Sequence, residues 1–205
     1  MPKLWNETIE AHRRAVRETA LDVTAALVAE HGAAAVTMSQ IAAAAGIGRA
    51  TLYKYFPDVE SLLAGWYERE VAAQLALLAE VRDREAAPGR RLAAVLAAYV
   101  RLVREQPPGL GSAAGPAVGA DDSSARGRLL GLFAELLAQA ADAGAIRDDI
   151  APQELAGYCL HSLGAAAEPV SGSARATERL LAVVLAGLDP PLRPRQPGAG
   201  AAGGS

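Results

Sequence analysis

The sequence lacks the features on which several protein classes depend. Cys159 is the only cysteine among 205 residues, so no intrachain disulfide can form. The three histidines are scattered along the chain, and no metal-binding cluster is visible. No apolar run approaches the roughly 18 residues that cross a bilayer, and the first residues lack the apolar segment of a signal peptide. We therefore expect a cytoplasmic protein with no membrane span, no metal and no cofactor.

Motifs of enzymes are missing as well. The sequence contains no nucleophile elbow, no phosphate-binding loop and no paired set of histidine and carboxylate residues. The alternation of apolar and polar residues that marks strands is almost absent, and there is no internal repeat. These absences favour a helical protein that is not an enzyme.

What the chain does contain is helical periodicity. Apolar residues make up 51% of the sequence, which is ample for a packed interior. Asn6 can cap a first helix that ends at His31 and Gly32. The apolar stripe of this helix has spacings of seven, four, three and four residues and consists of Ile9, Val16, Ala20, Val23 and Leu27. Similar periodicity and helix-ending residues predict further helices near residues 38–46, 49–56, 58–87, 90–105, 124–143, 152–167 and 174–188. The fold class is therefore predicted to be all-α.

Capping and helix-breaking residues set the limits of these helices. Thr37 followed by Gln40 fits a capping box, and Gly46 suits the left-handed turn that ends the short helix. Pro57 stops the next helix, and Asp58 can cap the one that follows. A Gly/Pro/Ala-rich stretch at residues 107–122 is expected to form a long loop, and the tail is expected to be disordered because it has little to bury.

The stretch GIGRATLYKYF, residues 46–56, gathers long polar side chains in a chain that is elsewhere rich in alanine and leucine. Short helices joined by a glycine-containing turn form a helix-turn-helix, whose second helix enters the major groove of DNA. Leu52 and Phe56 form an i, i+4 pair that faces inward, and Ile47 anchors the turn. The positions left for the groove and the phosphates are Arg49, Ala50, Thr51, Tyr53, Lys54 and Tyr55.

The charge distribution agrees with this interpretation. The net charge is −3, but residues 33–57 contain two bases, Arg49 and Lys54, and no acid. A second basic patch is formed by Arg13, Arg14 and Arg17. A locally basic end on an acidic protein is typical of a compact DNA reader. The alternatives are that these bases are ordinary solvated charges and that Tyr53 packs in the core.

The segment TMSQIAAAAGIGRATLYKYFPDVESLL closely resembles the signature of TetR-type transcriptional regulators. The shared features are a Thr-capped helix, an Ile-Ala step, an Ala-Gly step and a Thr-Leu-Tyr-x-Tyr-Phe helix that leads into an acidic, Leu-Leu helix. The resemblance covers about residues 10 to 65 and is one of architecture beyond that. It implies a helix-turn-helix DNA-binding domain at residues 1–57, a helical effector-binding and dimerisation domain at 58–189 and a tail at 190–205.

The resemblance also implies roles for individual residues. Thr37 and its helix N-terminus would hold a phosphate, as would Tyr55, with Thr51 nearby. Residues that would touch base edges or the adjoining backbone are Ser39, Arg49, Ala50, Tyr53 and Lys54. Arg49 is the best candidate to read a guanine, because a guanidinium can bond O6 and N7 together. Val59 departs from the pattern, since many members carry a lysine there that contacts a phosphate.

The expected function is a ligand-responsive, homodimeric repressor that a small hydrophobic effector releases from a palindromic operator. Aromatic candidates for a ligand cavity, each of which can equally be simple core, are Trp66, Tyr67, Tyr99, Phe133 and Tyr158. Apolar candidates for a four-helix dimer interface are Leu155, Cys159, Leu163, Leu181, Val184, Leu185 and Leu188. The alternatives are a helical protein-interaction module with weakened DNA binding and a regulator whose filled core takes no ligand.

Overall fold

The protein is built from helices in the computed structural model, which describes residues 2–105, 124–167 and 173–190. These residues contain no strand, which confirms the all-α prediction. No helix among them combines the length and the apolar composition that crossing a membrane requires. The expected loop at 107–122 and the tail after Pro190 lie outside the described residues. The elements are α1 (Pro2–His31), a 3-10 turn (Ala33–Ala35), α2 (Met38–Ala45), α3 (Arg49–Tyr55), α4 (Val59–Arg84), α5 (Pro88–Glu105), α6 (Ala125–Asp142), α7 (Pro152–Ala167) and α8 (Ala174–Leu188).

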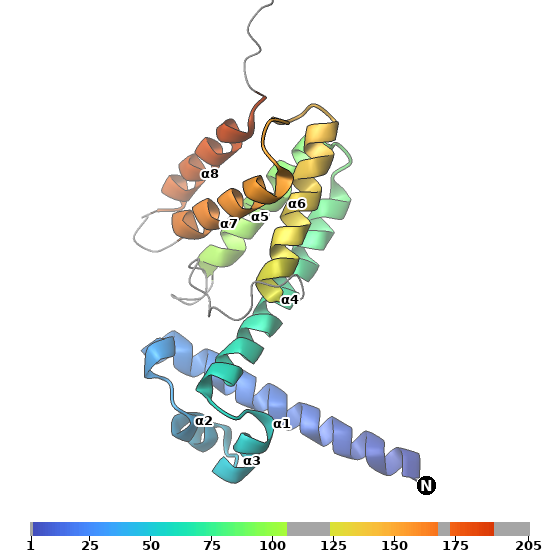
Figure 1. The fold of residues 1–205 in the computed structure, drawn as a ribbon. Coiled ribbons are helices and arrows are strands. Elements are labelled where there is room, and N and C mark those ends of the chain that lie inside the picture. The colour runs from blue at the N-terminus through green and yellow to red at the C-terminus, as the bar shows by residue number, and fades with distance from the viewer. Residues whose placement is uncertain (1, 106–123, 168–172, 191–205) are drawn as a thin grey trace, which may run out of the picture.

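The helices are arranged in two groups at opposite ends of α4 (Figure 1). We call α1, α2 and α3 with the first half of α4 the head, and α5 to α8 with the second half of α4 the body. In Figure 1 the head lies below and the body above, and α4 runs from one to the other. α4 is therefore the helix that the two groups share.

Helix limits in the head follow the predicted caps. The Thr37 hydroxyl accepts a hydrogen bond from the Gln40 N–H, and the Gln40 side chain accepts one from the Thr37 N–H, so the capping box is complete. Gly46 ends α2 with φ of 64°, a value that costs little only for glycine. Asp58 caps α4 by accepting a hydrogen bond from the Ser61 N–H at 2.7 Å.

Two helices begin earlier than the sequence predicted. α1 starts at Pro2 rather than after Asn6. α5 starts at Pro88, where the sequence analysis placed a break. Proline is well tolerated in the first turn of a helix, because the N–H that it lacks would have no intrahelical partner there. In both cases the proline opens the helix.

Two hydrophobic cores hold the groups together, and α4 contributes to both. Leu62 and Trp66 of α4 lie in the head core, so this core extends beyond the expected domain limit after Pro57. Val71 and Leu78, which follow Trp66 on α4 by more than one turn, lie in the body core. The Tyr67 side chain packs against both. The path of α4 is thus fixed by apolar packing at each of its ends.

The C-terminal end of α8 is tied to the loop between α6 and α7. The Arg147 N–H donates to the Leu188 carbonyl at 2.8 Å, and the Arg147 side chain donates to the Gly187 carbonyl at 3.2 Å. Asp149 accepts a hydrogen bond from the same guanidinium at 2.8 Å. Carbonyls at a helix C-terminus have no intrahelical partner, so a cation there is favourable. This contact holds α8 against the body.

Candidate nucleic-acid interface and effector pocket

The α2–α3 unit has the geometry of a helix-turn-helix. After Gly46 the Ile47 N–H donates to the Ala42 carbonyl at 3.0 Å, which closes the turn. Leu52 and Phe56 are buried, with exposed fractions of 1% and 2%, and both pack in the head core. One side of α3 is therefore fixed to the head, and the opposite side is left to solvent, as the i, i+4 pair predicted.

The predicted DNA-contact residues lie at the N-cap of α2, on α2 and on α3, and all but one of them are exposed. Tyr55 is half-buried and packs against the head core. The other seven are exposed: Thr37, Ser39, Arg49, Ala50, Thr51, Tyr53 and Lys54. Tyr53 is 52% exposed, so the alternative that it packs in the core is wrong. An aromatic ring held in solvent on a recognition helix is available to a partner.

The charges on this surface are not balanced by neighbouring acids. Residues 33–57 contain Arg49 and Lys54 and no aspartate or glutamate. Among the ion pairs of the described residues, none involves either side chain. Two unpaired cations on one short helix create a positive potential that attracts a polyanion.

Arg17 of α1 lies at the C-terminal end of α3. Its guanidinium stacks over the Phe56 ring at 4.9 Å from the centroid, a cation–π arrangement. Arg13, one turn earlier, forms an ion pair with Glu10 at 2.8 Å. Val59, the residue that departs from the family pattern, is half-buried and packs against the head core. Packing accounts for a valine at this position.

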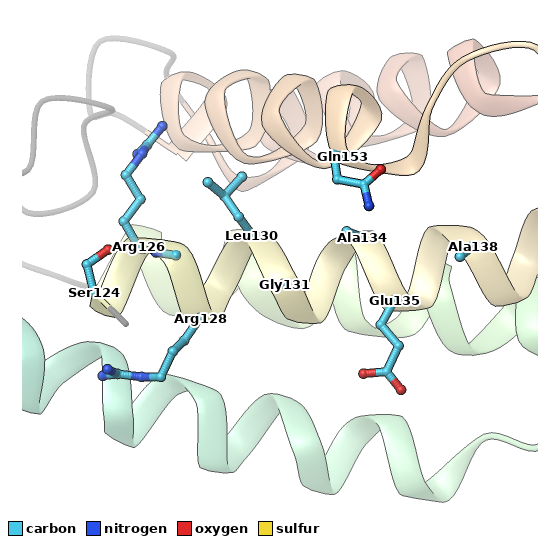
Figure 2. A pocket seen from close by; sticks show the side chains of 10 residues that line it. Ser124, Arg126, Arg128, Leu130, Gly131, Ala134, Glu135, Ala138 and Gln153 are labelled. Atoms are coloured by element: carbon cyan, nitrogen blue, oxygen red, sulfur yellow. Dashed lines mark hydrogen bonds between the residues drawn. The ribbon is translucent and has the colours of Figure 1, made fainter. Parts of the chain in front are cut away.

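The body has a pocket of about 650 Å³ along α6. Its residues lie on α6 and at the start of α7: Ser124, Arg126, Gly127, Arg128, Leu130, Gly131, Ala134, Glu135, Ala138 and Gln153. In Figure 2 Arg126 and Leu130 point towards α7, whereas Arg128 and Glu135 point towards α4. Small residues between them leave the middle of the pocket open. The volume is within the range of about 300–1,000 Å³ that is usual for small-molecule sites.

None of the five aromatic candidates lines this pocket. Trp66 is buried in the head core, and Tyr158 is 50% exposed on α7. Tyr99 and Phe133 pack edge to face in the body core, with centroids 5.2 Å apart. Tyr67 lies between the cores, and burial raises the pKa of its hydroxyl although nearby Arg126 opposes the rise. Trp66, Tyr99 and Phe133 are core residues, the alternative that the sequence left open for each of them.

The predicted dimer residues also need correction. Leu155, Cys159, Leu163, Val184 and Leu188 are buried within the single chain, in the body core, and Leu181 and Leu185 pack partly against that core. α7, which carries the first three of these residues, contacts α5 and α6, and α8, which carries the others, contacts α7 and α5. Cys159 is fully buried, and burial raises the pKa of its thiol to about 11, so the thiol is protonated near neutral pH. An interface on α7 and α8 has to use the outward side, which carries Tyr158, Leu180 and Val183.

Sequence reasoning did not find the pocket residues, nor Glu68 and Arg69, whose contacts are described below. Small residues such as Gly131 and Ala134 carry no chemical signal, and Glu68 and Arg69 read as ordinary charges on a long helix. Their arrangement depends on how α6 packs against α4 and α7. The one sequence signal was that Glu68 and Arg69 interrupt the apolar pattern of the long fourth helix near its middle.

Comparison with known families gives a consistent result along the chain. The family described as "Bacterial regulatory proteins, tetR family" matches residues 20–65. The "Transcriptional regulator SbtR-like, C-terminal domain" matches residues 87–190. An uncharacterized HTH-type transcriptional regulator of Mycobacterium tuberculosis is 33% identical over 91 residues. That match covers 42% of this chain and 43% of the relative, so the chain spans less than half the length of the curated relatives that it matches.

Solved structures share the fold. FadR from Bacillus subtilis in complex with stearoyl-CoA has a TM-score of 0.66 at 15% identity, over 83% of this chain and 98% of that one. AibR in complex with isovaleryl coenzyme A and operator DNA has a TM-score of 0.65 at 20% identity, over 86% of this chain and all of the other. Together with the helix-turn-helix geometry and the two family matches, they lead to one conclusion. The chain belongs to the TetR family of DNA-binding transcriptional regulators.

Proposed function

We propose that this regulator is a homodimeric repressor that binds a palindromic operator and is released by a small, largely apolar effector. The observation that carries the proposal is α3: its inner face is buried through Leu52 and Phe56, and its outer face presents Arg49, Tyr53 and Lys54 to solvent. The DNA-binding domain at residues 1–57, which lies within the head, reads DNA in the cytoplasm. The helical part at 58–189 binds the effector and dimerises, and residues 190–205 form a tail.

On DNA, each exposed side chain has a role that its chemistry suits. Arg49 at the start of α3 reads a guanine through two hydrogen bonds. Lys54, Tyr55 and Thr37 bind phosphates, with Thr51 nearby, and Ser39, Ala50 and Tyr53 face base edges or the adjoining backbone. Arg17, which is held over Phe56 at the end of α3, adds positive charge to the head.

The dimer forms through the outward side of α7 and α8. Six large apolar side chains of the described residues are exposed, and three of them, Tyr158, Leu180 and Val183, lie on these two helices. Exposed apolar side chains gathered on neighbouring helices favour association. A two-fold axis there makes the interface isologous and places two α3 helices for successive major grooves about 34–36 Å apart.

The effector binds in the α6 pocket. Leu130, Ala134 and Ala138 supply an apolar floor, while Arg126 and Arg128 supply positive charge at one end. This combination suits a molecule with an apolar body and an anionic or polar end. The solved relatives that hold stearoyl-CoA, isovaleryl coenzyme A and resorcinol share the fold of this chain. The effector acts by binding the DNA-free arrangement more tightly than the DNA-bound one.

Replacing Arg49 with alanine should reduce operator affinity by about 10–100-fold, because a good bidentate contact to a guanine contributes about 1–3 kcal/mol. The measurement is fluorescence anisotropy with a duplex selected by the wild-type protein from genomic fragments, at several salt concentrations. An unrelated duplex of equal length is the control, and there the loss should be much smaller. Equal losses on both duplexes would show that Arg49 contributes only charge. Wild-type binding that is equally weak on both would contradict the proposed function.

Filling the pocket should abolish the effector response without changing DNA affinity. No atom lies within 4 Å of a Cβ built at Gly131, so a side chain at this position begins in open space, and Gly131→Phe places a bulky ring at the pocket. We expect that stearoyl-CoA, isovaleryl coenzyme A or resorcinol weakens operator binding by the wild type and not by Gly131→Phe. Gly131→Ala, which leaves the pocket open, is the matched control and should respond as the wild type does. An unchanged response of Gly131→Phe would place the effector elsewhere.

A further inference from the structure

The head and the body meet at the middle of α4. Trp66 lies in the head core, Tyr67 packs against both cores, and Val71 lies in the body core. α1 contacts α2 and α4, and α4 in turn contacts α5 and α6 of the body. Glu68 and Arg69 occupy the short interval between the two cores. Tyr67 is the apolar bridge between the cores at this point, and Glu68 and Arg69 add polar contacts from the same turn of α4 to both groups.

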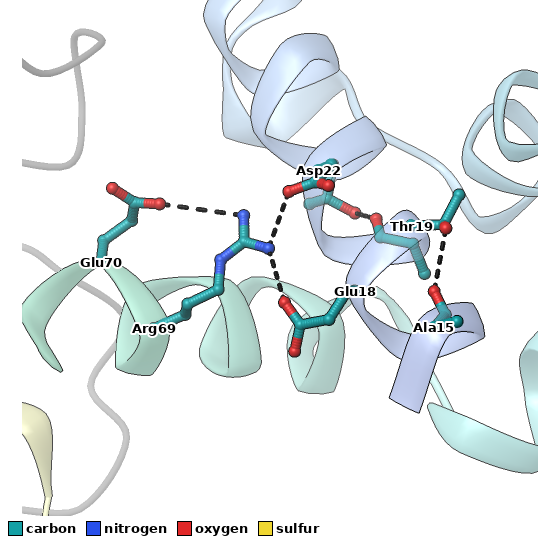
Figure 3. Close-up of polar contacts among 8 residues, drawn as sticks. Ala15, Glu18, Thr19, Asp22, Arg69 and Glu70 are labelled. Carbon is teal, nitrogen blue, oxygen red and sulfur yellow. Dashed lines mark hydrogen bonds and ion pairs between the residues drawn. The ribbon is translucent and has the colours of Figure 1, made fainter. Parts of the chain in front are cut away.

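Arg69 bonds to the head (Figure 3). Its guanidinium donates to the Asp22 carboxylate at 2.8 Å and to the Glu18 carboxylate at 3.1 Å, and both acids lie on α1. Glu18 and Asp22 are four residues apart, so without a cation between them they repel each other. Glu70 lies on the other side of the guanidinium at 3.9 Å. One side chain of α4 therefore bridges two turns of α1.

Glu68 bonds to the body. One carboxylate oxygen accepts a hydrogen bond from the backbone N–H of Ala125, the first residue of α6, at 2.7 Å. The other accepts from the Arg128 guanidinium at 2.8 Å. Both bonds involve a charged group and are stronger and more directional than neutral ones. Arg128 also lines the effector pocket, so the contact that Glu68 makes lies at the wall of the proposed effector site.

We propose that Glu68 and Arg69 form a clamp that fixes the angle between head and body and so sets the distance between the two α3 helices of the dimer. The inference rests on the proposed function and adds the residues that perform its positioning step. Arg69 holds α4 to α1, and Glu68, the preceding residue, holds α4 to α6. An effector that draws Arg128 away from Glu68 loosens the body side of the clamp, and the heads lose the spacing that the operator requires.

The clamp is a positioning device more than a source of stability. Its side chains are partly exposed, and ion pairs of this kind contribute little to folding. Their geometric effect is larger, since a dimer gains affinity from its second head only if that head already lies over the second half-site. Loosening the angle lowers this gain and leaves each head intact. The ratio of affinity for a full operator to affinity for a single half-site therefore measures the clamp directly.

The test compares the dimeric wild type with Arg69→Met and Glu68→Met on two duplexes, the full operator and one half-site in DNA of the same length. We expect each variant to lose about tenfold on the full operator and less than about twofold on the half-site, because only the gain from bivalency is affected. Operators with one base pair added or removed between the half-sites extend the measurement. The wild type should reject them, and the variants should discriminate less.

Controls and rescue come from the same helix. Arg84 and Glu80 of α4 pair with each other at 3.3 Å, and within the described part of the chain neither forms an ion pair with another element. Arg84→Met and Glu80→Met repeat the charge changes of the test variants and should keep the wild-type ratio. The double exchange Arg69→Glu with Asp22→Arg restores an ion pair between α4 and α1 and should recover most of the loss. Melting temperatures, measured at one protein concentration, should stay within a few degrees for all variants.

The outcomes separate the clamp from the proposed function. A lower ratio in the two test variants, absent in the controls and recovered by the exchange, supports the clamp. Equal weakening on the full operator and the half-site, or an unchanged ratio, overturns it while leaving the repressor proposal standing. Wild-type protein that binds no duplex selectively overturns the proposed function and the clamp with it.

Discussion

Replacing Phe133 with alanine should lower the free energy of unfolding by about 3–5 kcal/mol, because it removes a large side chain from a core that cannot fully collapse around the space. Phe133 has no exposed surface and lies at the centre of the body core. Its ring meets Tyr99 edge to face at an interplanar angle of 89°, and such pairs contribute about 0.5–1.5 kcal/mol beyond their buried area. Urea denaturation followed by circular dichroism measures the loss.

Tyr53→Ala is the control for this experiment. Tyr53 is also aromatic, but it is 52% exposed on α3, outside the body and outside the proposed dimer interface. Its truncation should cost less than about 1 kcal/mol. Both variants have to be compared at the same protein concentration, because dimerisation adds to the apparent stability. Similar losses for Phe133→Ala and Tyr53→Ala would contradict the position of the body core.

Replacing Val183 with aspartate should convert the dimer into a monomer and reduce operator affinity by about 100-fold or more, since bivalent binding contributes factors of this size. Val183 is 63% exposed in the single chain, the largest fraction among the exposed apolar side chains of the described residues. A carboxylate there costs nothing in the monomer, but in an apolar interface it would be buried without a partner. Sedimentation equilibrium measures the mass, and anisotropy measures the affinity.

Leu77→Asp is the matched control for the dimer experiment. Leu77 is 47% exposed on α4, away from α7 and α8, so an aspartate there adds the same charge outside the proposed interface. The Leu77→Asp protein should remain dimeric. If Val183→Asp also remained dimeric, the outward side of α7 and α8 would not be the interface. The choice of Val183 over its neighbour matters, because Val184 is buried and a charge at that position would unfold the body.

The head could be predicted almost completely from local chemistry. The capping box of Thr37 and Gln40, the left-handed Gly46 and the stop at Pro57 each act within a few residues. Leu52 and Phe56 define the inner face of α3 by their spacing alone, and this also fixes which residues remain exposed. Short-range hydrogen bonds and backbone preferences do not depend on the rest of the fold.

The body could be predicted only in part, because its helices are apolar on more than one side. On α7 the periodicity identified Leu155, Cys159 and Leu163 as an apolar face, and that face is real. In the structure α5 and α6 cover this face of α7, so the residues that were expected at a subunit contact lie in the body core instead. Aromatic residues were equally ambiguous: Trp66 and Phe133 are both buried, yet they belong to different cores.

The sequence by itself determined the all-α class, nearly every helix limit and which face of α3 is buried and which is exposed. Only the tertiary structure decided which side of α7 and α8 is free, where the pocket along α6 opens and which partners Glu68 and Arg69 take. The reason is physical. Caps and turns are bonds between neighbours in the chain, whereas a pocket or a clamp is made by side chains such as Arg69 and Asp22, 47 residues apart, that meet only after the helices have packed.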